Sequence, residues 1–170
     1  SQSVEEMTTR VLSLEESTKI MVMSPIVKGE KGTQKDLFEK PNSIAASKLS
    51  GCKNHSRIEK IDKYLCRAID WNIDLTVTSE ISDKDRYIGI RAHELIIVDD
   101  KERKKDINVE EFIIDELVEN IFSIVIMLRK ENGKQAIRLE VSKEYWQNNK
   151  RIGDTIYVKL PQDKIFLLDK

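Results

Sequence analysis

Cysteine and histidine are scarce in this sequence of 170 residues, which contains two of each. Cys52 and Cys66 stand far apart in the chain, and so they predict neither a disulfide framework nor a zinc site. We expect two reduced thiols in a cytoplasmic protein. His55 and His93 do not form part of any Ser/His/Asp or Cys/His arrangement, and we expect both to be surface or strand residues. The sequence therefore predicts no catalytic residue and no metal site.

A long apolar segment is also missing. The longest apolar run, from Ile121 to Leu128, is far shorter than the about 18 residues of a membrane-spanning helix. Ser1 to Arg10 is acidic and amphipathic, whereas a signal peptide begins with a basic segment followed by an apolar one. With 39% hydrophobic and 35% charged residues, the chain has the composition of a soluble globular protein.

A phosphate-binding loop is absent from the sequence as well. Such a loop has the form G-x-x-x-x-G-K-[ST], in which backbone amides and a lysine hold the phosphates. The nearest string is GEKGTQK, from Gly29 to Lys35, which has a different spacing and no Gly-Lys-Ser/Thr. We therefore expect this chain, as given, not to be an enzyme and not to hydrolyse ATP.

Positive charge gathers in one segment. Lys28 to Arg67 carries ten Lys or Arg against five Asp or Glu, although the formal net charge of the chain is −1. A basic segment of this kind attracts an anion or a nucleic acid, or it is a solvated mixed surface. Single-stranded nucleic acid binds to basic grooves with stacked aromatic side chains. Because aromatic residues make up only 6% of the chain and are scattered, a nucleic-acid partner is not favoured.

Helix signals dominate the first fifty residues. Ser3 and Glu6 form a capping box that predicts a helix to about Leu14. A short strand is predicted at residues 19–23, and a second helix starts at Thr33 and stops at Pro41. Asn42 or Ser43 caps a third helix, SIAASKL, which Gly51 ends.

After Gly51 the pattern changes to short β segments with turn residues between them. Glu131 to Lys134, ENGK, predicts a hairpin turn, and no strong internal repeat is visible. Many short strands at fairly regular intervals predict a small barrel or sandwich. The predicted strands lie at residues 55–61, 64–69, 73–79, 86–92, 123–128, 135–141, 155–160 and 164–168.

Several motifs resemble the ATP-binding subunits of ABC transporters, in particular those of molybdate-type oxyanion importers. In that family the catalytic core is followed by a pattern like G-T-P-x-E-L-F-E-x-P-x-x-x-x-A-A-x-L-x-G-x-x-N. It stands here as Gly32-Thr33, Asp36-Leu37-Phe38-Glu39, Pro41, Ala45-Ala46, Leu49, Gly51 and Asn54. YIGIRAHEL, at residues 87–95, resembles a strand of the regulatory domain that follows, and residues 137–168 resemble its last repeat.

The resemblance implies a mainly β fold, in which a short α/β remnant of a nucleotide-binding domain at residues 1–50 precedes a small OB-like transport-associated barrel at residues 51–170. The implied function is regulation and dimerisation of the ATP-binding subunit of an ABC importer. Its partners would be a second copy and membrane permease subunits, at the inner face of the cell membrane. ATP and Mg would be bound only by a full-length subunit, and this chain would carry no cofactor.

An alternative from the same resemblance is an intracellular oxyanion sensor that inhibits transport. Several donors must then surround a dianion in a partly dry pocket. Related molybdate-binding domains use serine, arginine and lysine side chains. The equivalent candidates here are Lys53, Asn54, Ser56, Arg57, Ser142 and Lys143. Gln2 stands where the importer family has its switch histidine. A further alternative is an OB module that binds single-stranded nucleic acid.

Overall fold

The computed structural model describes residues 41, 43–99, 106–146 and 149–170. The elements predicted within residues 1–40, and Gln2 with them, lie outside this part of the chain. All described residues belong to one unit, Lys40–Lys170. The predicted boundary near residue 50 stays a prediction.

A short helix precedes the strands. α3 spans Ile44–Leu49, and the hydroxyl of its N-cap, Ser43, accepts a hydrogen bond from the Ala46 amide at 3.1 Å. Gly51 follows the helix with a φ of 93°, which glycine adopts without steric cost. Both predicted ends of this helix are confirmed. The Ile44 amide donates to the carbonyl oxygen of Lys170 at 2.6 Å, so the helix is bonded to the other end of the described chain.

The strands form two antiparallel five-stranded sheets, with the orders β10-β4-β1-β2-β3 and β5-β9-β6-β7-β8. One sheet is therefore built from β1 to β4 with β10, and the other from β6 to β9 with β5. The strands are β1 (Asn54–Asp62), β2 (Leu65–Ala68), β3 (Ile73–Thr76), β4 (Tyr87–Ile90), β5 (Ile96–Val98), β6 (Val109–Glu119), β7 (Ser123–Arg129), β8 (Ile137–Ser142), β9 (Thr155–Lys159) and β10 (Phe166–Leu168).

The segment from β1 to β5, residues 54–98, and the segment from β6 to β10, residues 109–168, have the same order of elements, and we call them the first and the second repeat. A 3-10 helix, Ala92–Glu94, lies between β4 and β5, and another, Gln162–Lys164, lies between β9 and β10. Leu95 and Ile165 follow these two helices at equivalent positions, and both are buried. The sequence shows no strong repeat because the equivalence lies in the burial pattern more than in residue identity.

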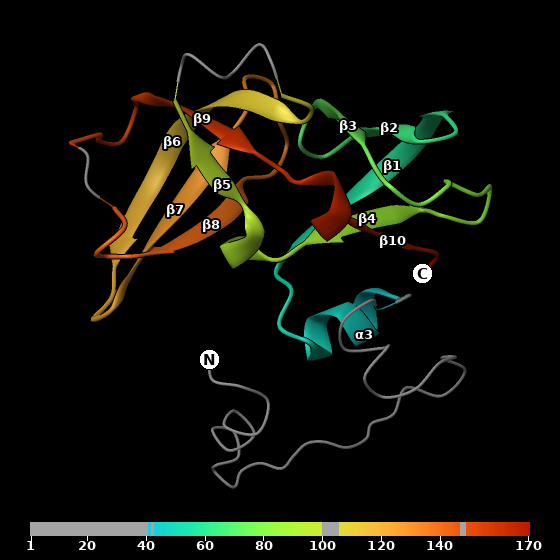
Figure 1. Ribbon diagram of the computed structural model, residues 1–170, viewed down its shortest axis with the longest axis horizontal. Coiled ribbons are helices and arrows are strands. Elements are labelled where there is room, and N and C mark those ends of the chain that lie inside the picture. Colours follow the sequence, from blue (N-terminus) through green and yellow to red (C-terminus); the bar gives the residue numbers. More distant parts are fainter. Residues whose placement is uncertain (1–40, 42, 100–105, 147–148) are drawn as a thin grey trace, which may run out of the picture. The chain divides into compact units, whose positions relative to one another are not determined.

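The two repeats exchange their last strands. β5 of the first repeat pairs with β9 of the second repeat, whereas β10 of the second repeat pairs with β4 of the first. Figure 1 shows the exchange by colour: dark-red β10 lies beside green β4, and green β5 lies beside orange-red β9. Neither sheet is complete without a strand from the other repeat.

Side chains from both sheets form one hydrophobic core. The alternation of strands directs every second residue inward, as at Phe112 and Ile114 on β6. Trp71, after β2, is 2% exposed and belongs to the same cluster as Leu139 on β8. Burying one such side chain stabilises the fold by about 1.5–3 kcal/mol. The repeats therefore share a single core.

The predicted mainly β architecture is confirmed, and all eight strands predicted after Gly51 are present. The turn ENGK lies in the connection between β7 and β8, where Asn132 has a φ of 66°. Two strands, β5 and β6, were not predicted. β5 has only three residues, and β6 contains five acidic residues, a type that is depleted in strands.

Candidate functional site

Asn54, a predicted effector ligand, is 3% exposed at the start of β1. Its side-chain amide donates to the Arg138 carbonyl oxygen at 2.8 Å and accepts from the Arg138 amide at 2.8 Å. Arg138 lies on β8, the edge strand of the other sheet. Asn54 therefore pairs with this edge in the way that a strand residue would. The fold thus uses both hydrogen-bonding ends of this side chain.

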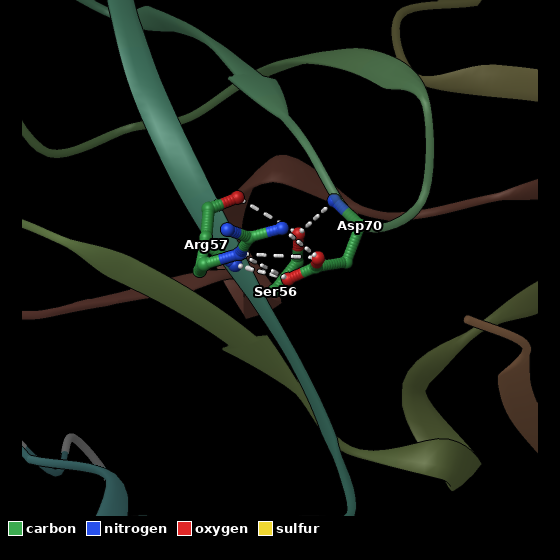
Figure 2. Close-up of polar contacts among 3 residues, drawn as sticks. All are labelled: Ser56, Arg57 and Asp70. Atoms are coloured by element: carbon green, nitrogen blue, oxygen red, sulfur yellow. Dashed lines mark hydrogen bonds and ion pairs between the residues drawn. The ribbon is translucent and has the colours of Figure 1, made fainter. Parts of the chain in front are cut away.

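Ser56 and Arg57 also bond within the protein, and both meet Asp70 (Figure 2). The Ser56 hydroxyl donates to the Arg57 carbonyl oxygen at 2.8 Å and accepts from the Asp70 amide at 3.1 Å. Arg57 donates from its backbone amide to Asp70 Oδ2 at 2.9 Å and from Nη2 to Asp70 Oδ1 at 2.7 Å. This cluster joins β1 to the turn that follows β2. Sequence reasoning missed Asp70 because nothing local to it indicates a partner on β1.

Electrostatics in this cluster favour the ion pair. The hydrogen bond from Arg57 lowers the pKa of the Asp70 carboxyl, against the opposing effect of burial. The same bond raises the pKa of the Arg57 guanidinium. The Asp70 side chain is 7% exposed and that of Arg57 is 53% exposed, so the Arg57 side chain stays partly in contact with water.

The remaining predicted ligands lie elsewhere. Ser142 ends β8, and its hydroxyl accepts from the Tyr145 amide at 3.1 Å. Lys143 Nζ pairs with Glu119 Oε2 at 2.8 Å. The Asn54 side chain is hydrogen-bonded to the backbone of Arg138. Ser142 lies four residues further along the same strand, which is a distance of about 13 Å in an extended chain. The structure thus does not gather the six predicted ligands into one pocket. Lys53 is exposed. Effector binding by these residues stays a prediction.

His55 on β1 contacts α3 through a hydrogen bond between its Nε2 and the Ser47 hydroxyl at 2.7 Å. Ser47 is fully buried, and the imidazole is partly buried. Burial lowers the pKa of His55, and the nearby charge of Lys48 lowers it further. The ring can lie here because the neighbouring residue is Gly89, at which a Cβ would approach His55 Cδ2 to 3.2 Å. This pair holds the helix on the sheet.

Large apolar side chains are exposed where the first two strands of each repeat join. Ile61, near the end of β1, and Tyr64, in the turn before β2, are 51% and 43% exposed. Ile121 and Phe122, between β6 and β7, are 78% and 83% exposed. We call these two pairs the apolar turns. Sequence reasoning placed Ile121 in the longest apolar run without recognising that this run begins outside the core.

Among the described residues, no three His, Cys, Asp or Glu side chains are grouped closely enough to hold a metal ion. No helix in this part of the chain is long and apolar enough to cross a membrane. Cys52 and Cys66 are free and buried, and burial raises the pKa of the Cys66 thiol to about 11.

Comparison with known families identifies a match over the first part of the chain. Residues 2–86 match the model of the UvrA interaction domain, and this range includes β1, β2 and β3. The chain belongs to the UvrA interaction domain family. The family match thus differs from the ABC importer subunit that the sequence motifs predict.

Curated relatives agree with this family. UvrABC system protein A of Listeria monocytogenes serotype 4b (strain F2365) is 50% identical over 98 residues, which cover 54% of this chain. The protein of the same name from Listeria innocua serovar 6a has the same identity and coverage. The aligned region is 10% of each relative, so the chain spans about a tenth of their length.

Among solved structures, the fold resembles that of the cytoplasmic molybdate-binding protein ModG with molybdate bound. The TM-score is 0.54 at 9% sequence identity, over 69% of this chain and 96% of that one. An identity this low shows a shared fold and nothing more. The predicted OB-like character of the strands is confirmed.

Proposed function

We propose that this chain is a non-catalytic protein-interaction module, which binds another protein of the UvrABC system. The observation that carries the proposal is the pair of apolar turns. Where its first two strands join, the first repeat exposes Ile61 and Tyr64, and the second repeat exposes Ile121 and Phe122. Aromatic side chains are enriched in protein interfaces, and the buried centre of an interface is more apolar than the rest of the protein surface. Membership in the UvrA interaction domain family supports the same reading.

Hydrogen bonds between polar side chains and the rest of the fold support a non-catalytic role. Asn54 and Ser56 are buried and hydrogen-bonded to the backbone of other strands or turns. His55 bonds to the buried Ser47 hydroxyl. These groups stabilise the packing of the sheets and α3, and a reaction at any of them would first have to break a bond that holds the fold.

A binding measurement tests the proposal. The chain would be immobilised and titrated with the B and C proteins of the UvrABC system. We expect one of them to bind, and we expect Tyr64→Ser or Phe122→Ser to weaken binding by at least about tenfold, since aromatic anchors dominate interface energies. Ile152→Ser is the matched control, because Ile152 is 62% exposed but lies outside the apolar turns. Absence of binding to both proteins would refute the proposal.

A second candidate is the one that the importer-like motifs predict: a regulatory domain that pairs two ATP-binding subunits of an ABC importer and senses an oxyanion. The OB-like fold shared with ModG favours it. Among the predicted ligands, Lys53 is exposed and adjoins the buried Asn54. Its partners would be a second copy of the chain and the permease subunits, with ATP and Mg bound only by the full-length subunit.

Calorimetry with molybdate, tungstate, sulfate and phosphate tests this second candidate. If the second candidate is correct, at least one of these anions should give a measurable heat of binding, and this heat should be absent in Lys53→Ala. Light scattering would also have to show a dimer. A monomer that binds none of the four anions would exclude it.

A further inference from the structure

The strand β6 extends beyond its neighbour β9. β9 pairs with β6 only from Val109 to Ile113, whereas β7 pairs with β6 from Ile113 to Glu119. In the part of the chain that the structure describes, no strand pairs with residues 115–119 on the side away from β7. We call this side of residues 115–119 the open edge.

Backbone groups of the open edge are directed outward at alternate residues. The Asn120 amide donates to the Ser123 carbonyl oxygen at 2.8 Å, so Asn120 bonds toward β7. Because successive residues of an antiparallel strand bond to opposite sides, Val118 also bonds toward β7, while Leu117 and Glu119 present their backbone groups to the other side. The end of β6 is exposed, with Val118 at 41%. Such an edge is a template for another strand.

We propose that the open edge binds an extended basic segment of a partner protein by strand addition. This inference rests on the proposed protein-interaction function and gives it a location and a mode. In strand addition, main-chain hydrogen bonds provide affinity and side-chain pockets provide specificity.

Charge indicates the chemistry of the partner. Within β6, residues 115–119 have the sequence DELVE, with three acidic residues and no basic one. Asp115 and Glu119 pair with Arg129 and Lys143, at 3.1 Å and 2.8 Å, which neutralises part of this charge. A second copy of β6 would bring like charges face to face, which destabilises cross-strand pairs. A segment that alternates lysine or arginine with apolar residues would bring opposite charges together.

A shallow groove at the end of the open edge gives the partner an apolar contact. The groove has a volume of about 750 Å³ and is lined by Glu119, Asn120, Ile121, Phe122, Ser123 and Lys143. One of the apolar turns thus borders the open edge. An apolar side chain of the added strand can reach Phe122 while its backbone pairs with Glu119.

A peptide experiment tests the proposal. The probe is a short capped peptide of alternating lysine and valine, compared with one of alternating glutamate and valine. We expect the lysine peptide to bind, with affinity that falls as salt rises, and to protect the Leu117 and Glu119 amides from hydrogen exchange. We expect the glutamate peptide not to bind. Equal binding of the two peptides, or protection elsewhere in the chain, would overturn the inference.

Two variants separate backbone pairing from charge. Glu119→Pro removes an outward N–H but no N–H that bonds toward β7, and we expect it to weaken lysine-peptide binding at least about tenfold. Glu119→Ala keeps the N–H and is the matched control, with a smaller loss expected. If Glu119→Pro unfolds the hairpin, Glu116→Lys combined with Glu119→Lys serves instead, and the peptide preference should then reverse. Unchanged preference would refute the charge argument.

Failure here is distinguishable from failure of the proposed function. If a UvrABC protein binds the chain and Glu119→Pro binds it as tightly as the original, the open edge is not the site and the proposed function stands. If neither UvrABC protein binds, the proposed function fails, whatever the peptide does.

Discussion

Asn108 forms a two-bond bridge to Thr76, on a strand of the other sheet. Its side-chain amide donates to the Thr76 carbonyl oxygen at 2.8 Å, and its side-chain oxygen accepts from the Thr76 amide at 2.8 Å. Asn54 makes the equivalent bridge to Arg138. β3 and β8 are the edge strands at equivalent positions of the two sheets. Each repeat therefore uses one asparagine to close an edge of the other sheet.

Replacing Asn108 should destabilise the protein in two separable ways, through loss of the bridge and through backbone strain. The glycine variant measures the first effect, and the alanine variant measures both. Asn108 has a φ of 64° and is 8% exposed. Asn108→Gly keeps this backbone conformation accessible but leaves the Thr76 backbone groups without their partner, so we expect a loss of about 1–3 kcal/mol. Asn108→Ala should lose about 1–2 kcal/mol more because of its Cβ. Urea unfolding measures both, and a fully stable Asn108→Gly variant would contradict the bridge.

Asp70 predicts loss of stability in acid. Its pKa is lowered in the folded state by the hydrogen bond from Arg57. The folded state therefore binds this proton less readily, and the stabilisation that is present above the unfolded pKa of about 3.9 is lost as pH falls through the folded value. Asp70→Asn should be less stable at neutral pH and should show a shallower decline in the free energy of unfolding below about pH 4. An unchanged acid profile would rule out this role.

His55 predicts a second pH dependence, at higher pH. Burial and Lys48 lower its pKa in the folded state, so the neutral form is favoured. Stability from this group is present above the unfolded pKa of about 6.5 and is lost as pH falls through the folded pKa. We expect His55→Gln to flatten the change in the free energy of unfolding between about pH 7.5 and about pH 5.5. The control is His93→Gln, because the His93 side chain is 67% exposed.

Gly89 predicts a steric coupling with the exchanged strand. A Cβ at this position would lie 2.7 Å from Phe166 Cε1 on β10. Gly89→Ala should destabilise the protein by about 1–3 kcal/mol, the usual cost of overpacking. In a Phe166→Leu background, which removes the ring, the same substitution should cost less. A double-mutant cycle by thermal unfolding measures the coupling, and additive losses would show that the ring yields without strain.

Local pattern was enough to place most elements but not β6. The strands β4 and β9 were predicted because apolar and polar residues alternate there and turn residues bound them. In β6, by contrast, Glu110, Glu111, Glu116 and Glu119 are interspersed with apolar residues in a way that fits neither a clear strand nor a clear helix. This segment forms a strand because it pairs with β7 and β9, and the residues of those strands lie outside the segment.

The candidate site shows the same limit. Residue types suggested that Asn54, Ser56 and Arg57 hold an external anion. Their partners are Arg138 and Asp70, and the fold, rather than any local spacing, brings these residues beside β1. The exchange of β5 and β10 was equally invisible, since a strand of three residues does not specify which sheet it joins.

The exchange of strands determines when each sheet can be completed during synthesis on the ribosome. β1 to β4 emerge before β10, so the sheet that they form acquires its outer strand only when Phe166–Leu168 has been translated. Until then the outer edge of β4 is without β10. Pairing between segments so distant in sequence is also slow because loop-closure entropy must be overcome first. The nascent first repeat is therefore the stage at which a chaperone would be most useful and a foreign strand most harmful.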